Sequence, residues 1–276
     1  MNQELQSHLL RVLDSRPSGS PDSVSGGCIH QCFHWGNYFI KTNTLEHEAT
    51  FRTEATGLQL IAATETIRVP EVVTHGIDEN SAYLVLEHLE LTSSGNEALL
   101  GEKLAALHQH ESEQFGFPED NFIGATPQPN PWTDDWRSFF RDQRLGHMLT
   151  LLETNGIHFS HTESLLSRVS KLLPENPKKS LLHGDLWGGN KAFLRDGTPV
   201  IFDPACYHGH AACDLAMTTL FGGFSNRFYD AYRSSSNLDD PTLHEIYNLY
   251  HILNHALLFG GSYVSQADGI IRRFTG

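Results

Sequence analysis

An aspartate, an asparagine five residues later and a second aspartate 13 residues further on are the most constraining feature of this sequence. These residues are Asp185, Asn190 and Asp203, and Asp203 directly follows the apolar segment 200–202. A tight loop can present Asp185 and Asn190 on one side, and the next strand brings Asp203 towards them. In phosphotransfer sites the first Asp accepts or orients the proton of the attacking hydroxyl, while the Asn and the second Asp are hard oxygen ligands for Mg²⁺. The spacing therefore favours such a site over two unrelated turns.

A second set of residues upstream fits the same chemistry. Gly26 and Gly27 precede a predicted strand, and Lys41 lies near the end of the following one. A glycine-bearing turn lets backbone N–H groups approach phosphates, which a lysine can neutralise. A buried lysine needs a carboxylate partner. Glu54, 13 residues after Lys41, is the better placed candidate, and Glu48 is the alternative.

The hydrophobic pattern divides the chain into a strand-rich front part and a helical rear part. Strands are predicted at 29–33, 38–41, 68–75 and 81–89, and helices at 1–14, 45–64, 97–110, 133–154, 161–173 and over most of 213–272. The composition changes near residue 90, so we expect an α+β protein of two lobes, 1–89 and 90–276. The strand end at 87–89 would then be the hinge between them.

The net charge and the cysteine content of the chain restrict which partners, metals and cellular compartments are compatible with it. The 19 Lys and Arg against 33 Asp and Glu give a net charge of −14, which argues against nucleic acid and against an anionic membrane surface. No apolar run approaches membrane-spanning length, and the first residues do not resemble a signal peptide. Four cysteines are too few for a disulfide scaffold, and their spacing disfavours structural zinc. These features predict a reduced, cytoplasmic protein.

The motifs together resemble the fructosamine kinase (ketosamine-3-kinase) family, a branch of the aminoglycoside- and choline-kinase-like group with a protein-kinase-like fold. The resemblance covers nearly the whole chain, and two of its segments are specific to this family. They are Gly184-Asp185-Leu186-Trp187 and Leu220-Phe221-Gly222-Gly223-Phe224.

The resemblance implies ATP and Mg²⁺ as cofactors and a role for each matching residue. Asp185 would be the catalytic base, Asn190 and Asp203 would hold Mg²⁺, and Lys41 with Glu54 would contact the nucleotide phosphates. The backbone of Glu87, His88 and Leu89 would bind adenine. The implied reaction phosphorylates the sugar 3-hydroxyl of a ribulosamine, erythrulosamine or fructosamine. The substrate would be free or carried on glycated protein lysines, and the result would be deglycation.

Other matching residues receive substrate-side or structural roles. Trp187 follows the base by two residues and could pack on the sugar, as could Asn121 and Gln128 in a polar loop. His183 is interpreted as a structural hydrogen-bonding residue and Asp214 as a brace of the catalytic loop. The chain departs from the family where Ala211-Ala212 replaces a common Arg-Glu pair, which leaves fine specificity open.

Cys28 lies in the predicted nucleotide loop, where backbone N–H groups would favour a thiolate. We therefore expect a redox role, including a homodimer linked through Cys28, with an inert thiol as the alternative.

Two further functions stay open at this point. One is a kinase for another amine-bearing alcohol, such as an aminoglycoside or a choline analogue. The other is a nucleotide-binding regulator without turnover.

Overall fold

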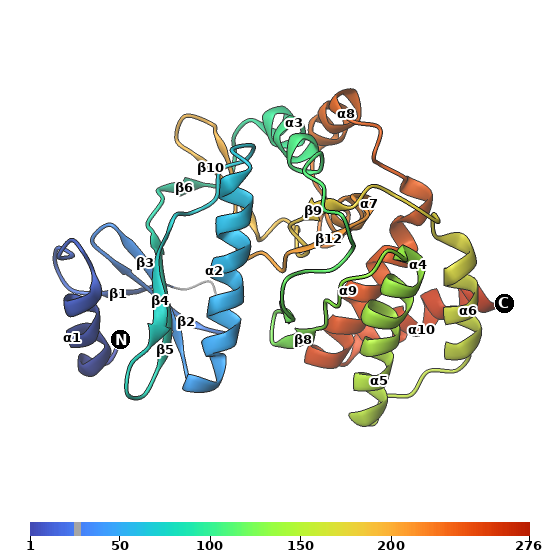
Figure 1. Ribbon diagram of the computed structural model, residues 1–276, viewed down its shortest axis with the longest axis horizontal. Coiled ribbons are helices and arrows are strands. Elements are labelled where there is room, and N and C mark those ends of the chain that lie inside the picture. Colours follow the sequence, from blue (N-terminus) through green and yellow to red (C-terminus); the bar gives the residue numbers. More distant parts are fainter. Residues whose placement is uncertain (25–28) are drawn as a thin grey trace.

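The front part of the protein is a five-stranded antiparallel sheet with a helix on each face (Figure 1). The computed structural model describes residues 1–24 and 29–276. The sheet has the strand order β1-β2-β3-β5-β4. The elements of this part are α1 (Gln3–Val12), β1 (Asp22–Val24), β2 (Gln31–Trp35), β3 (Tyr38–Asn43), a 3₁₀ turn (Leu45–His47), α2 (Glu48–Ala63), β4 (Val72–Ile77) and β5 (Ala82–Glu87).

Successive side chains of a strand point to opposite faces of the sheet, so a strand with consecutive apolar residues needs a packing partner on both faces. On the outer face, Leu5 and Leu9 of α1 pack with Trp35 and Tyr38. On the inner face, α2 contributes Phe51 and its apolar neighbours to the main core. β5 lies between the two helices, and its first five residues are buried. A nearly continuous apolar strand is what burial on both faces requires.

The rear part is mainly helical and also contains three small sheets, of which the one with β6 and β10 lies beside the front part (Figure 1). Its helices are α3 (Glu97–Leu107), α4 (Trp136–Ser138), a π-helix (Phe139–Gly146), α5 (His147–Thr154), α6 (Thr162–Leu172), α7 (Ala212–Met217), α8 (Asn226–Ser235), a 3₁₀ turn (Pro241–Leu243), α9 (His244–Phe259) and α10 (Ser262–Thr275). Its strands are β6 (Leu91–Thr92), β7 (Asn121–Ile123), β8 (Thr126–Gln128), β9 (Ser180–Leu182), β10 (Lys191–Leu194), β11 (Pro199–Ile201) and β12 (Tyr207–Gly209). The α+β class predicted from the sequence is confirmed.

Helix α2 also packs directly on the rear part. Gly57 approaches so closely that an added Cβ would lie 3.0 Å from Sγ of Cys206 and 3.3 Å from Cγ of Pro204. Near the start of the same helix, Arg52 forms an ion pair with Glu119 of the rear part. These contacts fix α2 against the segment that follows Asp203 and against the segment that contains Glu119.

Two predicted elements differ from the observed ones. The strand expected at 68–75 begins at Val72, because Pro70 has no amide hydrogen to donate to a ladder. The single helix expected at 133–154 is divided into α4, the π-helix and α5.

We propose that the lobes divide between residues 89 and 90. β5 ends at Glu87, and the next strand, β6, pairs with β10 of the rear part. Among the described residues, no helix is both long and apolar enough to cross a membrane.

Candidate active site

A buried cation shared by two carboxylates lies where the two lobes meet. Lys41 is on β3, and its Nζ donates to Oε1 of Glu54 on α2 at 2.7 Å and to Oδ1 of Asp203 at 2.5 Å. Burial opposes the charge on Lys41, but Asp203 and Glu54 outweigh it and raise the pKa of the ammonium group. Glu48, the other candidate partner, instead faces Arg52, with Oε1 3.6 Å from Nε. The structure thus selects Glu54.

The loop that carries Asp185 is held by backbone hydrogen bonds. The amides of His183 and Gly184 donate to the two carboxylate oxygens of Asp214 at 2.7 and 2.8 Å. Gly184 has a φ of +82°, and a side chain there would overlap the carbonyl oxygen of Ala205. The His183 ring lies 3.0 Å from the carbonyl oxygen of Phe202. His183 and Asp214 therefore occupy the bracing positions that the sequence predicts.

Asp185 and Asn190 are brought together by the turn between β9 and β10. The Asn190 Nδ2 donates to the backbone oxygen of Asp185 at 2.9 Å and to its Oδ2 at 3.2 Å. Burial, and next the charge of Asp203, raise the pKa of Asp185 to about 7. A carboxyl group with a pKa near neutrality is suited to accept a proton during a reaction.

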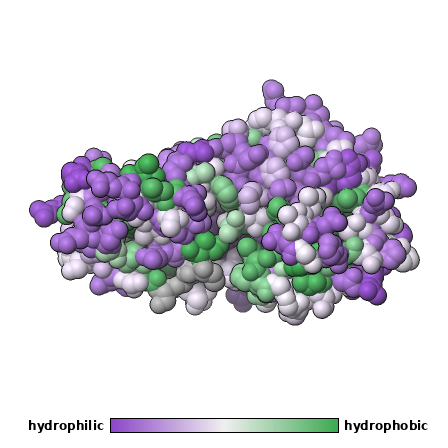
Figure 2. Space-filling view, turned by 90° about the horizontal axis from the view of Figure 1, so that it is seen from below, coloured by the Kyte–Doolittle hydropathy of each residue, from purple (hydrophilic) through white to green (hydrophobic). Residues whose placement is uncertain are grey.

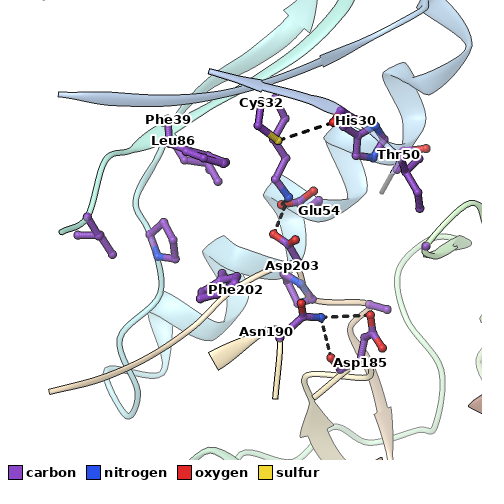
Figure 3. A pocket seen from close by; sticks show the side chains of 18 of the residues that line it. His30, Cys32, Phe39, Thr50, Glu54, Leu86, Asp185, Asn190, Phe202 and Asp203 are labelled. Atoms are coloured by element: carbon purple, nitrogen blue, oxygen red, sulfur yellow. Dashed lines mark hydrogen bonds and ion pairs between the residues drawn. The ribbon is translucent and has the colours of Figure 1, made fainter. Parts of the chain in front are cut away.

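Asp203 occupies a strained backbone position. Its φ is +58°, a left-handed conformation that is uncommon for a residue other than glycine. The preceding amide, that of Phe202, donates to the carbonyl oxygen of Asn190 at 3.1 Å and ties the two segments together. Figure 3 shows Asp203 between Glu54 above it and Asn190 with Asp185 below. Strain of this kind is found at functional sites.

A cavity of about 700 Å³ between the lobes contains most of the predicted site residues (Figure 3). Its walls include Lys41, Glu54, Glu87, His88, Leu89, Asn121, Asp185, Trp187, Asn190 and Asp203. Residues 93–180 contribute only Asn121 and Phe122 of β7 and Gly124 of the turn that follows it to these walls. A cleft of this size matches a ligand of nucleotide dimensions plus a small acceptor.

The hinge segment presents few unused backbone groups. The amides of Glu87 and His88 donate to the carbonyl oxygens of Glu71 and Asn37, both at 2.8 Å. Within the described residues the amide of Leu89 makes no such bond, so it is available to a ligand in the cavity. The ring of His88 stacks on His34 with a centroid separation of 3.9 Å.

The donor atoms available for a metal fit magnesium. Asn190 uses its amide nitrogen to hold Asp185, which leaves Oδ1 for a cation, and Asp203 offers a half-exposed carboxylate. Among the described residues there is no group of three or more His, Cys, Asp and Glu side chains that could hold a metal. Mg²⁺ commonly uses one or two protein oxygens and completes its shell with phosphates and water.

The polar side chains of β7 and β8 form a buried hydrogen-bond network. From the sequence alone, this structural role could not be distinguished from substrate binding. Gln128 is fully buried, and it donates to Asn121 at 2.7 Å and accepts from the Tyr250 hydroxyl at 2.7 Å. Asn121 in turn donates to the carbonyl oxygen of Cys206 at 2.7 Å. Gln128 does not line the cavity, so a contact between Gln128 and the substrate stays a prediction that the structure does not support. Its side chain braces Asn121, and only Asn121 lines the cavity.

Arg144 is a residue of this network that sequence reasoning missed. Its guanidinium is fully buried, donates to Oδ1 of Asn130 at 2.6 Å and lies 4.1 Å from the centroid of the Tyr207 ring. The sequence around it, Asp142-Gln143-Arg144-Leu145, is mostly polar and resembles that of many surface arginines, so it did not signal burial.

Other predicted features lie outside the described residues or inside the core. Gly26, Gly27 and Cys28, with the redox role proposed for Cys28, fall in 25–28, which the structure does not describe. The cysteines in the described part, Cys32, Cys206 and Cys213, are free thiols and are buried. Ala211 and Ala212 are fully buried, so the surroundings at these positions admit small side chains.

Comparison with known proteins adds an independent observation. The family model described as fructosamine kinase matches residues 1–275. The chain belongs to the fructosamine kinase family. A probable ketoamine kinase from Synechocystis is 48% identical over 91% of this chain and 88% of its own length. The chloroplastic protein-ribulosamine 3-kinase of Arabidopsis thaliana is 40% identical over 90% of this chain and 80% of its own length.

Solved structures agree with this family assignment. The crystal structure of a putative fructosamine-3-kinase from Haemophilus somnus has a TM-score of 0.91 at 29% identity, with 99% of this chain and 97% of that chain covered. Solved structures of an aminoglycoside phosphotransferase and of a choline/ethanolamine kinase family protein share the fold alone, each at 15% identity and a TM-score of 0.63. The protein-kinase-like fold and the phosphotransferase class predicted from the sequence are confirmed for this fructosamine kinase family member.

Proposed function

We propose that the protein is an ATP-dependent ketosamine 3-kinase. The observation that carries the proposal is the convergence of Asp185, Asn190 and Asp203 with the Lys41–Glu54 pair on one cavity between the lobes. Family membership supports the same reaction, because relatives are named as ketoamine and protein-ribulosamine 3-kinases.

Each residue has a definite task in this reaction. Asp185 accepts the proton of the sugar 3-hydroxyl as its oxygen bonds to the γ-phosphorus, and the bond from that phosphorus to the bridging oxygen of ADP breaks. Lys41 holds phosphate oxygens and is itself held by Glu54. The Leu89 amide would bind the adenine ring. Mg²⁺, held by Asn190 and Asp203, would offset the negative charge of the phosphates.

The acceptor is proposed to be a ketosamine, a sugar attached to an amine after an Amadori rearrangement. Phosphorylation at O3 makes the adduct prone to elimination, which frees the amine, so the biological outcome is deglycation. The net charge of −14 suits an acceptor that carries a protonated amine. Trp187 lines the cavity two residues after the base and is placed to contact the sugar.

The deciding experiment measures ADP release with Mg-ATP and lysine-linked ribulose, erythrulose and fructose. Kanamycin and choline serve as comparison acceptors, and Asp185→Ala is the control. We expect ketosamine-dependent turnover that disappears in the variant, with the phosphate located at O3 by ³¹P–¹H NMR. Turnover on kanamycin or choline alone would refute the ketosamine assignment. Nucleotide binding with no turnover on any acceptor would indicate a regulator.

A further inference from the structure

A chain of aromatic side chains leads from the cavity to the molecular surface. Trp187 lines the cavity, and the Phe221 ring lies against it with centroids 5.8 Å apart and planes at 79°. Beyond Phe221 follow His255 at 4.7 Å and Tyr263 at 6.4 Å between ring centroids. Phe259 extends the series, 5.5 Å from His255. We call these five residues the aromatic ramp.

The backbone holds Phe221 in a costly conformation. Its φ is +53°, and the two glycines that follow have φ values of +107° and +72°. Phe221 is nevertheless 41% exposed, so burial in the core does not account for this conformation. A non-glycine residue in this conformation, exposed beside a catalytic loop, indicates selection for what the side chain contacts.

The ramp is apolar and lacks a cation of its own. The cation–π contacts among the described residues use other rings, such as those of Phe193 and Tyr229, and none of them involves Trp187 or Phe221. Burial lowers the pKa of His255, so this ring is neutral at physiological pH and does not repel a cation. Figure 2 shows apolar surface on both sides of the hollow between the lobes.

We propose that Phe221 and Trp187 form the subsite for the protonated secondary amine of the ketosamine, and that the alkyl chain attached to this amine lies along His255, Tyr263 and Phe259. The inference rests on the proposed function and deepens it, because it names the part of the substrate that is not sugar. The occupant is a linear alkylamine of the lysine side-chain type. A cationic amine is attracted to aromatic faces, and its methylene groups bury against them.

The position of the subsite agrees with the chemistry. In a ketosamine the amine is on C1 and the phosphorylated hydroxyl on C3, so a sugar whose 3-hydroxyl faces Asp185 has its amine two carbons away, in the cavity that Trp187 also lines. The remaining chain then has to run outward, and the ramp is the apolar path that begins there. An acceptor that lacks the protonated amine, or the alkyl chain attached to it, would leave the rings of the aromatic ramp exposed to water.

The test compares three acceptors with wild-type enzyme and with Phe221→Leu. The acceptors are ribulose linked to the ε-nitrogen of Nα-acetyl-lysine amide, its isostere with an ether oxygen in place of that nitrogen, and N-methyl ribulosamine. We expect wild type to prefer the amine over the ether by roughly tenfold in KM, and Phe221→Leu to remove most of that preference. The KM for ATP and the kcat should change less than about twofold.

Two further variants separate recognition from folding. Trp132→Leu is the matched control, because Trp132 is 42% exposed and does not line the cavity, and it should behave as wild type. Phe221→Gly relieves the positive φ, so its melting temperature should equal or exceed that of wild type while the amine preference is lost.

The outcomes distinguish the two proposals. An unchanged amine preference in Phe221→Leu, with ketosamine turnover intact, would overturn the subsite and leave the proposed function standing. A lowered melting temperature in Phe221→Gly with the preference retained would assign Phe221 a purely structural role. Absence of wild-type turnover on every ketosamine would overturn both proposals.

Discussion

The ammonium group of Lys41 lies 2.5 Å from Oδ1 of Asp203, although the two residues are 162 positions apart in the sequence. The same nitrogen also donates to Glu54. One buried cation therefore links the sheet of the front lobe, helix α2 and the segment that follows β11. The positioning of α2 and the placement of Asp203 both depend on this single charge, as would the proposed contact with the nucleotide phosphates.

Replacing Lys41 should cost both stability and activity. We expect Lys41→Met to lower the free energy of unfolding by about 3 kcal/mol, because it leaves Glu54 buried without a counter-charge. The double variant Lys41→Met/Glu54→Leu should regain most of that loss in urea unfolding and stay inactive. If the double variant is as unstable as the single one, the unpaired charge of Glu54 does not explain the loss of unfolding free energy.

Replacing Asp185 should have the opposite effect on stability. The pKa of Asp185 is raised to about 7 in the folded state, above its ordinary value of 3.8. Its contribution to stability is therefore full below pH 4 and is lost as the pH rises through about 7. We expect Asp185→Asn to be more stable than wild type by about 1–3 kcal/mol at pH 8, discounted for the partial exposure of this residue, and by less at pH 5. Urea titrations at the two pH values measure the difference, and equal gains at both would contradict it.

The same pKa predicts how the reaction depends on pH. In the proposed reaction Asp185 accepts a proton, which only its deprotonated form can do, so kcat/KM for the ketosamine should fall about tenfold per pH unit below 7 and level off above it. A profile that stays flat down to pH 5 would show that protonation of Asp185 does not limit the rate. The residual activity of Asp185→Asn should lack this dependence.

Asn190→Ala should weaken the response to magnesium. The variant loses the Oδ1 atom that we propose as a Mg²⁺ ligand and also the hydrogen bond from Nδ2 to Asp185. We expect the half-saturating Mg²⁺ concentration to rise by roughly tenfold or more, together with a lower kcat. Asn80→Ala, in an exposed turn of the front lobe, is the control and should titrate as wild type. An unaltered Mg²⁺ titration in Asn190→Ala would remove this residue from the metal site.

The glycine pair after Trp187 offers a matched comparison. A methyl group at Gly189 would overlap the indole ring of Trp187, whereas one at Gly188 would meet no atom within 4 Å. We expect Gly189→Ala to displace the indole and raise the ketosamine KM several-fold, at an unchanged KM for ATP, while Gly188→Ala behaves as wild type. Equal kinetics in the two variants would argue against a substrate contact by Trp187.

The sequence predicted site residues best where the chemistry of phosphate transfer restricts the type of residue and its order along the chain. Asp185, Asn190 and Asp203 were predictable because few reactions need these oxygens at that spacing, and Lys41 required a carboxylate within reach. The roles of Asn121 and Gln128 were not separable, because an amide that binds a sugar and an amide that binds a backbone carbonyl look alike in a sequence. The Lys41–Asp203 contact and the burial of Arg144 arise only from tertiary packing, which local periodicity does not encode.

The close packing of Gly57 against Pro204 and Cys206 has a consequence for control of the enzyme. In protein kinases, the Lys–Glu pair must be assembled, and movement of the equivalent helix governs it. Here a helix that touches the opposite lobe through a glycine has no space to swing, and the Lys41–Glu54 pair is already formed. Under the proposed function, turnover should therefore follow the concentrations of ATP and ketosamine rather than a movement of α2.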